Sequence, residues 1–120
     1  MKIGQLAETT GVSTSRIRFY EKHGLMPLPT RLENGYRDYP EEMISRLRTI
    51  TMSKALGFTL SEIRRILPDD PNDLIARSDV MANLETKLTD IDQQIKDLKA
   101  MRGKVKEMIA YFQDPNSASC

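Results

Sequence analysis

The stretch IGQLAETTGVSTSRIRFYEKHG, residues 3–24, contains two short helical patterns separated by a break. The apolar residues of the first pattern are Ile3, Leu6 and Ala7. Gly11 interrupts this pattern, and Ser13 is a residue type whose hydroxyl caps helix N-termini. The second pattern runs on from Ser13 to His23, where a glycine follows. The stretch therefore predicts a helix, a tight turn and a second helix.

A hairpin is predicted in the segment ENGYRDYP, residues 33–40. Its Asn-Gly dipeptide tolerates the positive φ that both central residues of a two-residue hairpin turn require. We therefore expect the chain to reverse at Asn34 and Gly35, each with positive φ. The strand that follows holds Tyr36, Arg37 and Tyr39. Pro40 ends it, because proline cannot donate to a ladder, and so short a hairpin needs a neighbouring element for stability.

Two further helices are predicted after the hairpin. Pro40 opens the third helix, whose first turn is acidic and whose apolar residues recur at helical spacing until Gly57 stops it. These apolar residues are Met43, Ile44, Leu47 and Ile50. Thr59 and Glu62 have the spacing of a capping box and predict a fourth, short helix. The sequence PDDPND, residues 68–73, then indicates a linker.

A heptad seam begins at residue 81, where apolar side chains fall at steps of three and four with polar residues between them. Its members are Met81, Leu84, Leu88, Ile91, Ile95, Leu98, Met101, Val105, Met108 and Phe112. At ~1.5 Å per residue the seam is roughly 48 Å long, which is too long for the small preceding part of the chain to cover. We therefore expect the same helix of a second copy to cover it, as in the common two-fold dimers.

Length, charge and cysteine content limit the classes of function. A chain of 120 residues forms one ordinary domain, or a small domain with an added element. Residues 1–65 carry eleven Lys and Arg against seven Asp and Glu, whereas residues 66–120 carry seven against ten, so the basic half suits nucleic acid. The single cysteine excludes an internal disulfide and favours a reducing compartment. No stretch has the length of a membrane span or of a signal peptide's apolar core, so we expect a soluble, cytoplasmic protein without a membrane partner.

Residues 2–67 closely resemble the DNA-binding domain of the mercury-resistance regulator (MerR) family of bacterial transcription factors. The spacing IRFYE…GL…R…NGYRDY carries the resemblance most specifically, and the heptad seam is similar to the family's dimerisation helix. The resemblance implies an all-α fold with a winged helix-turn-helix head and an antiparallel coiled-coil dimer. The domains that follow from it are a DNA-binding domain over 1–68, a linker over 69–79, a dimerisation helix over 80–112 and a tail over 113–120.

The function that the resemblance implies is control of transcription through DNA shape. A family dimer bends and untwists a promoter whose two recognition elements are too far apart, so that RNA polymerase engages both. The implied partners are double-stranded promoter DNA, a second copy of the chain and bacterial RNA polymerase. The alternative is an architectural or interaction protein that binds DNA nonspecifically and acts through its coiled coil. No enzyme is expected, because the sequence offers no paired carboxylates in a cleft, no nucleophile with a base and no Gly-rich phosphate loop.

The resemblance also implies which residues contact DNA. In the family the second helix enters the major groove, where arginine pairs with guanine edges, and the hairpin is a wing on the backbone. Base reading is expected of Thr14, Ser15, Arg16 and Arg18. Phosphate contact is expected of Arg37, through its planar fork, together with Tyr36 and Tyr39. By position in the family pattern, DNA contacts fall on Arg18, Tyr20, Arg31, Tyr36, Arg37 and Tyr39, with Lys54 as a weaker one.

Several of these residues also have a structural interpretation without DNA. Arg16 and Arg18 can form a solvated helix face, and Tyr20 can belong in part to the core. Arg31 and Lys54 can be ordinary surface charges. These alternatives stay open on the sequence alone.

The tail is where the metal sensors of this family hold two spaced cysteines. Cys120 stands where the second of those cysteines falls, but Phe112 occupies the first position, and Arg77 lies near the helix opening, where a small residue or cysteine is usual. A single thiolate cannot enclose a soft monovalent metal, so we predict no metal site and no cofactor. We predict a free thiol at Cys120, with thiol or redox sensing as the alternative. His23 is predicted to cap a helix rather than to bind metal.

Overall fold

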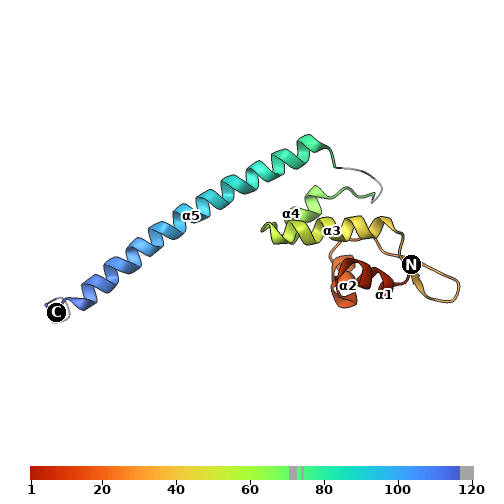
Figure 1. Cartoon of the computed structure of the whole chain (residues 1–120), viewed down its shortest axis with the longest axis horizontal. Helices are drawn as coiled ribbons and strands as arrows, with labels where there is room; N and C mark the ends of the chain where they lie inside the picture. Colours follow the sequence, from red (N-terminus) through yellow and green to blue (C-terminus); the bar gives the residue numbers. More distant parts are fainter. Residues whose placement is uncertain (71–72, 74, 117–120) are drawn as a thin grey trace. The chain divides into compact units, whose positions relative to one another are not determined.

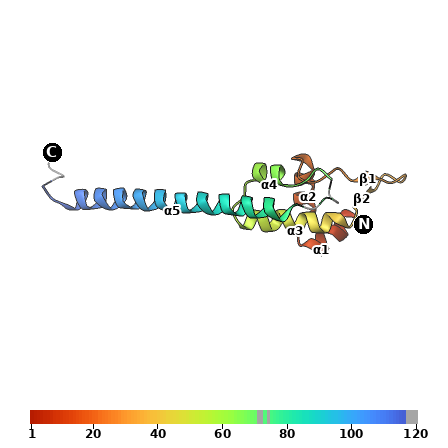
Figure 2. The ribbon, with the colours of Figure 1, turned by 90° about the horizontal axis from the view of Figure 1, so that it is seen from above.

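The computed structural model describes residues 1–70, 73 and 75–116. It divides into two units, Met1–Ala76, here called the head, and Arg77–Cys120. The elements in chain order are α1 (Ile3–Thr10), α2 (Thr14–Lys22), β1 (Thr30–Arg31), β2 (Arg37–Asp38), α3 (Glu42–Ala55), α4 (Leu60–Ile66) and α5 (Arg77–Gln113). Figure 1 labels the helices along the chain, and Figure 2 also labels the strands. The predicted fold class is confirmed, because helices dominate, a two-stranded wing follows α2, and a long helix comes last.

Helices α1 and α2 form the predicted helix-turn-helix. Gly11 ends α1 with φ +74° and donates its N–H to the Ala7 carbonyl at 2.8 Å, a left-handed cap that glycine adopts without steric cost. Ser13 caps α2, since its hydroxyl accepts the N–H of Arg16 at 3.2 Å. His23 is the C-cap of α2, as expected. Both ends of the turn are therefore fixed by bonds between near neighbours in the sequence.

Helices α3 and α4 also begin and end at the predicted signals. α3 starts two residues after Pro40, and Gly57, with φ +90°, follows its end. The capping box of α4 is complete: the Thr59 hydroxyl accepts the Glu62 N–H at 3.2 Å, and the Glu62 carboxylate accepts the Thr59 N–H at 3.0 Å. α3 packs against both α1 and α4, which places it at the centre of the head.

The hairpin has very short antiparallel strands and extends away from the helices of the head (Figure 2). Thr30 lies opposite Asp38, and Arg31 lies opposite Arg37. The ladder is shorter than the strand predicted from the sequence, which reached Tyr39. At the base of the hairpin the Tyr39 N–H donates to the carbonyl of the first residue at 2.8 Å, which joins the wing to the segment before α1.

The chain reverses at the predicted dipeptide, but the turn differs from the predicted one. Among the described residues only glycines have positive φ, so Gly35 is left-handed at +83° and Asn34 is not. The Gly35 N–H donates to the Leu32 carbonyl at 2.9 Å, and the Leu32 N–H donates to the Tyr36 carbonyl at 2.8 Å. These bonds define a three-residue loop closed by a left-handed glycine. The Asn34 side chain instead accepts the Tyr36 N–H at 3.1 Å, which favours asparagine at this position for another reason.

The core of the head brings side chains from the helices, the connector and the wing into one cluster. Its buried members are Leu6, Ile17, Tyr20, Leu25, Met26, Tyr39, Met43, Leu47, Ile50, Phe58, Ile63 and Leu67. Arg46 of α3 is also buried: its Nε donates to the Leu25 carbonyl and its Nη1 to the Pro68 carbonyl, each at 2.7 Å. Burial lowers the pKa of this guanidinium, an effect opposed by the charge of Asp69. Arg46 therefore ties α3 to the segment after α2 and to the end of α4.

Helix α5 is 37 residues long, about 55 Å at 1.5 Å per residue, and Figure 1 draws it without interruption. It begins at Arg77, three residues before the predicted boundary at 80, and ends one residue after Phe112. Every residue of the heptad seam is exposed. Among the described residues no helix combines the length and apolar character needed to cross a lipid bilayer.

Candidate nucleic-acid interface

The beginning of α2 presents a group of polar side chains to solvent. Thr14, Ser15, Arg16 and Arg18 are all exposed. Ile17, in the middle of the group, is fully buried and anchors this turn in the core. The guanidinium of Arg16 lies 5.7 Å from the centre of the Phe19 ring, one helical turn further on. The helix therefore offers a polar, cationic end with the geometry that a major groove accepts.

A cleft of about 700 Å³ lies between the start of α1, helix α2 and the wing. It is lined by Lys2, Ile3, Gly4, Gln5, Glu8, Arg18, Gly35, Tyr36 and Arg37. The structure therefore brings Arg18 of α2 together with Tyr36 and Arg37 of the wing, all three of which the sequence predicted as DNA contacts. Lys2 was not predicted. Its Nζ lies 5.0 Å from the centre of the Tyr36 ring, so it belongs to the same surface.

Arg37 is joined to α2 by a buried carboxylate. Its Nη1 lies 3.3 Å from Glu21 Oε2, and the Glu21 side chain is 4% exposed. The other oxygen, Glu21 Oε1, accepts the hydroxyl of Tyr39. Burial raises the pKa of Tyr39, and its hydrogen bond to Glu21 raises it further. Sequence reasoning missed Glu21, which fixes the wing to α2.

Tyr39, which the sequence predicts as a DNA contact, is buried in the structure. Its side chain is 1% exposed and its hydroxyl donates to Glu21, so neither the ring nor the oxygen is open to a phosphate. Tyr20 also belongs to the core, at 5% exposed, which agrees with its alternative interpretation. Arg31 and Lys54 are exposed on β1 and at the end of α3, and neither lines the cleft.

The described residues include no group of three or more His, Cys, Asp or Glu placed to hold a metal ion. His23 at the end of α2 packs against Phe19, with ring centres 4.2 Å apart. Cys120 lies outside the described residues, so the thiol assigned to it stays a prediction.

Two family models match the chain and extend these geometric observations. Residues 1–70 match the model described as MerR HTH family regulatory protein, and residues 44–118 match the model described as MerR, DNA binding. A helix-turn-helix with a wing, matched in this way, defines a DNA-binding transcriptional regulator. The chain belongs to the MerR family.

Similar proteins cover both the head and the long helix. The mercuric resistance operon regulatory protein of Bacillus cereus is 37% identical over 107 residues, which are 89% of this chain and 81% of that protein. The HTH-type transcriptional regulator CueR of Yersinia pestis is 34% identical over 120 residues, covering 100% of this chain and 86% of that protein. The crystal structure of the transcription regulator PbrR691 from Ralstonia metallidurans CH34 in complex with lead(II) has a TM-score of 0.76 and 30% identity, covering 92% of this chain and 86% of that one.

Proposed function

We propose that the chain acts as a homodimer that binds an inverted-repeat promoter site and distorts the DNA between the half-sites, which controls initiation by RNA polymerase. The observation that supports this best is the joint surface of α2 and the wing, in which Arg18 and Arg37 line one cleft. In this proposal Thr14, Ser15, Arg16 and Arg18, which are exposed at the start of α2, read bases. Tyr36 and Arg37 of the wing contact the phosphate backbone.

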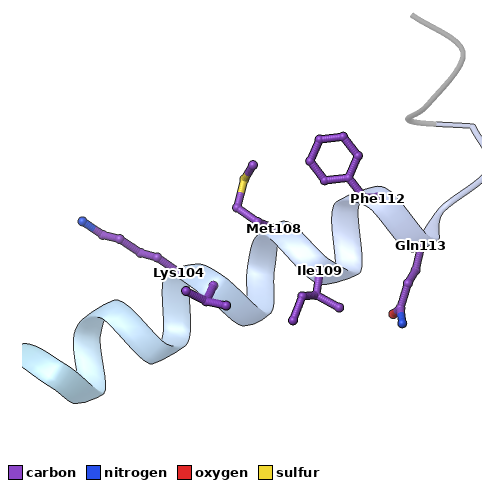
Figure 3. A pocket seen from close by; sticks show the side chains of 6 residues that line it. Lys104, Met108, Ile109, Phe112 and Gln113 are labelled. Carbon is purple, nitrogen blue, oxygen red and sulfur yellow. The ribbon is translucent and has the colours of Figure 1, made fainter.

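The proposed dimer rests on the exposed heptad seam of α5. Leu88, Leu98 and Phe112 are each at least 59% exposed, and burying a side chain of this type contributes about 1.5–3 kcal/mol. Near the end of α5 the apolar surface widens, because Ile109 joins Val105, Met108 and Phe112 (Figure 3). A second copy of the helix supplies a matching seam, and its two-fold symmetry then duplicates the DNA-binding surface. An inverted repeat is the operator that such symmetry requires.

The proposed distortion follows from holding DNA at two flanks. A protein that grips the backbone on both half-sites can bend or untwist the base pairs between them, and the energy of that deformation depends on their sequence. Membership of the MerR family supports this mechanism for the chain. The polymerase then senses the altered spacing of its two recognition elements rather than a direct contact with the regulator.

Selection of binding sites from random duplex DNA by the full chain tests the proposal. We expect enrichment of an inverted repeat. The variant Arg18→Ala is expected to lose about 1–3 kcal/mol of binding free energy on that site and to relax the preference at one symmetric pair of positions. Arg48→Ala, which removes an exposed arginine of α3 outside the cleft, serves as the control. Enrichment of no repeat would favour the architectural alternative.

Transcription in vitro tests the distortion separately. We expect the protein to change initiation at a promoter that contains the selected site. Deleting base pairs between the two polymerase elements should make that promoter independent of the protein, because the spacing no longer needs correction. A shortened promoter with unchanged dependence on the protein would contradict the distortion mechanism while leaving operator binding intact.

A further inference from the structure

We infer that Lys2 is a further DNA-contacting residue, and that the cleft beside it holds a backbone phosphate between the start of α1 and the wing. This inference rests on the proposed function and extends it to a residue outside α2 and the hairpin. Neither the helical patterns nor the hairpin signal of the sequence includes Lys2.

The position of Lys2 is fixed by two contacts. As the N-cap of α1 it has extended backbone, and its N–H donates to the Gln5 side-chain oxygen at 3.2 Å. Its Nζ lies 5.0 Å from the centre of the Tyr36 ring, within the range of a cation–π interaction. The ammonium is therefore held beside the wing, and an exposed interaction of this kind is weak enough to let it turn toward an anion.

The charges around the cleft favour an anionic ligand. Lys2, Arg18 and Arg37 line it, with Glu8 as the carboxylate among the lining residues. Arg37 already pairs with Glu21, but over residues 1–70, 73 and 75–116 no ion pair involves Lys2 or Arg18. Two cations without a carboxylate partner thus lie in one cleft beside the Tyr36 ring. A phosphate diester offers the charge and the acceptor oxygens that this set of donors lacks.

Lys2 should affect affinity without affecting sequence preference. Lysine acts on phosphate as a point charge and carries no information about the base. The loss of one phosphate contact lowers the dependence of binding on salt, because fewer counterions are released. In a two-fold symmetric dimer each such contact occurs twice.

The test compares Lys2→Met, which keeps the stem and removes the charge, with Lys22→Met. Lys22 is an exposed lysine in the last turn of α2 and does not line the cleft. Binding of the full-length variants to the selected operator and to an unrelated duplex is measured by fluorescence anisotropy across a salt series. The slope of log affinity against log salt is negative for a DNA-binding protein. For Lys2→Met we expect its magnitude to be smaller by ~2 per dimer on both duplexes. The ratio of wild-type affinity to Lys2→Met affinity should then be about tenfold smaller at 200 mM salt than at 50 mM salt. Lys2→Arg and Lys22→Met should keep the wild-type slope.

Three outcomes would overturn the inference: a wild-type slope for Lys2→Met, an equal fall for Lys22→Met, or a change of base preference in Lys2→Met. Thermal denaturation of each variant shows that the fold is intact. The proposed function fails independently, if wild type selects no operator. In that case the unrelated duplex still tests Lys2, because a backbone contact requires no particular sequence.

Discussion

Arg37 of the wing and Glu21 of α2 form an ion pair within the proposed DNA-binding surface, with Arg37 Nη1 3.3 Å from Glu21 Oε2. The Glu21 side chain is 4% exposed, whereas that of Arg37 is 37% exposed. The acid therefore orients the guanidinium from the protein side and leaves part of it open to solvent. This pair joins the helix proposed to read bases to the wing proposed to contact the backbone. The two elements are therefore held in a fixed position relative to each other.

Arg37→Ala is expected to destabilise the head even without DNA. It leaves the buried Glu21 carboxylate without its cationic partner, and we expect a loss of about 1–2 kcal/mol because the exposed side of Arg37 is screened by solvent. Urea denaturation of the full chain measures this. Arg31→Ala is the matched control, since Arg31 lies opposite Arg37 in the ladder but is exposed. Equal losses for both variants would mean that the pair with Glu21 contributes nothing to stability.

Tyr39 should make the free energy of unfolding depend on pH in the alkaline range. Its folded pKa is raised above the usual 10.0 by burial and by the hydrogen bond to Glu21. Its contribution is therefore complete below pH 10 and is lost as the pH rises through the folded pKa, because the unfolded chain releases the proton first. Tyr39→Phe should flatten this fall in urea denaturation followed across the alkaline range.

Tyr36→Phe is the control for this pH experiment, because Tyr36 is exposed. Tyr39→Phe should also cost about 1–3 kcal/mol at neutral pH, since a buried carboxylate loses a donor. An alkaline fall that persists unchanged in Tyr39→Phe would show that another group causes it.

Replacing Arg46 by methionine should destabilise the head by about 2–4 kcal/mol. The Leu25 and Pro68 carbonyls lose a charged donor at 2.7 Å each. Arg46→Lys should recover only part of the loss, because an ammonium cannot match the directions of both carbonyls as the guanidinium fork does. Arg48→Met, an exposed position on the same helix, should lie within the error of wild type. The midpoint of urea denaturation separates these outcomes.

The dimer is tested by placing charge in the heptad seam. Leu88→Lys combined with Ile95→Lys buries unpaired ammonium groups that cost several kcal/mol each, so the dimer should dissociate. Thr89→Lys combined with Gln93→Lys adds the same charge on the outer face of the heptad and should leave the dimer intact. Sedimentation at micromolar concentration distinguishes the two. A monomeric wild type would refute the proposed assembly.

The features that sequence predicted correctly depend on bonds between close neighbours. The Ser13 hydroxyl needs only the N–H three residues on, and Thr59 with Glu62 closes its box over the same distance. Gly57 acts through its own φ. Signals of this kind are complete within one helical turn, so the order and type of the helices follow from them.

The features that sequence missed depend on residues far apart in the chain. Glu21 and Tyr39 meet only because α2 packs beside the base of the wing, and no periodic pattern marks that contact. Lys2 precedes the first helical pattern, and its place beside Tyr36 follows from the path of the hairpin. The turn type at Asn34 was wrong for a related reason: the length of the loop, set by the strand register, decided which residue takes positive φ.

The facing positions of Arg31 and Arg37 in the two-stranded ladder set two like charges directly opposite each other, an arrangement that weakens a hairpin. Glu21 compensates the charge of Arg37 in part, and among the described residues no ion pair compensates that of Arg31. Salt consequently acts on the wing in opposite senses. Before DNA is bound, mobile ions screen the repulsion and favour the closed ladder, but on the duplex the same ions would compete with Arg37 for the backbone contact proposed above. The ladder should therefore be most stable at high salt, where the proposed contact of the wing with DNA is weakest.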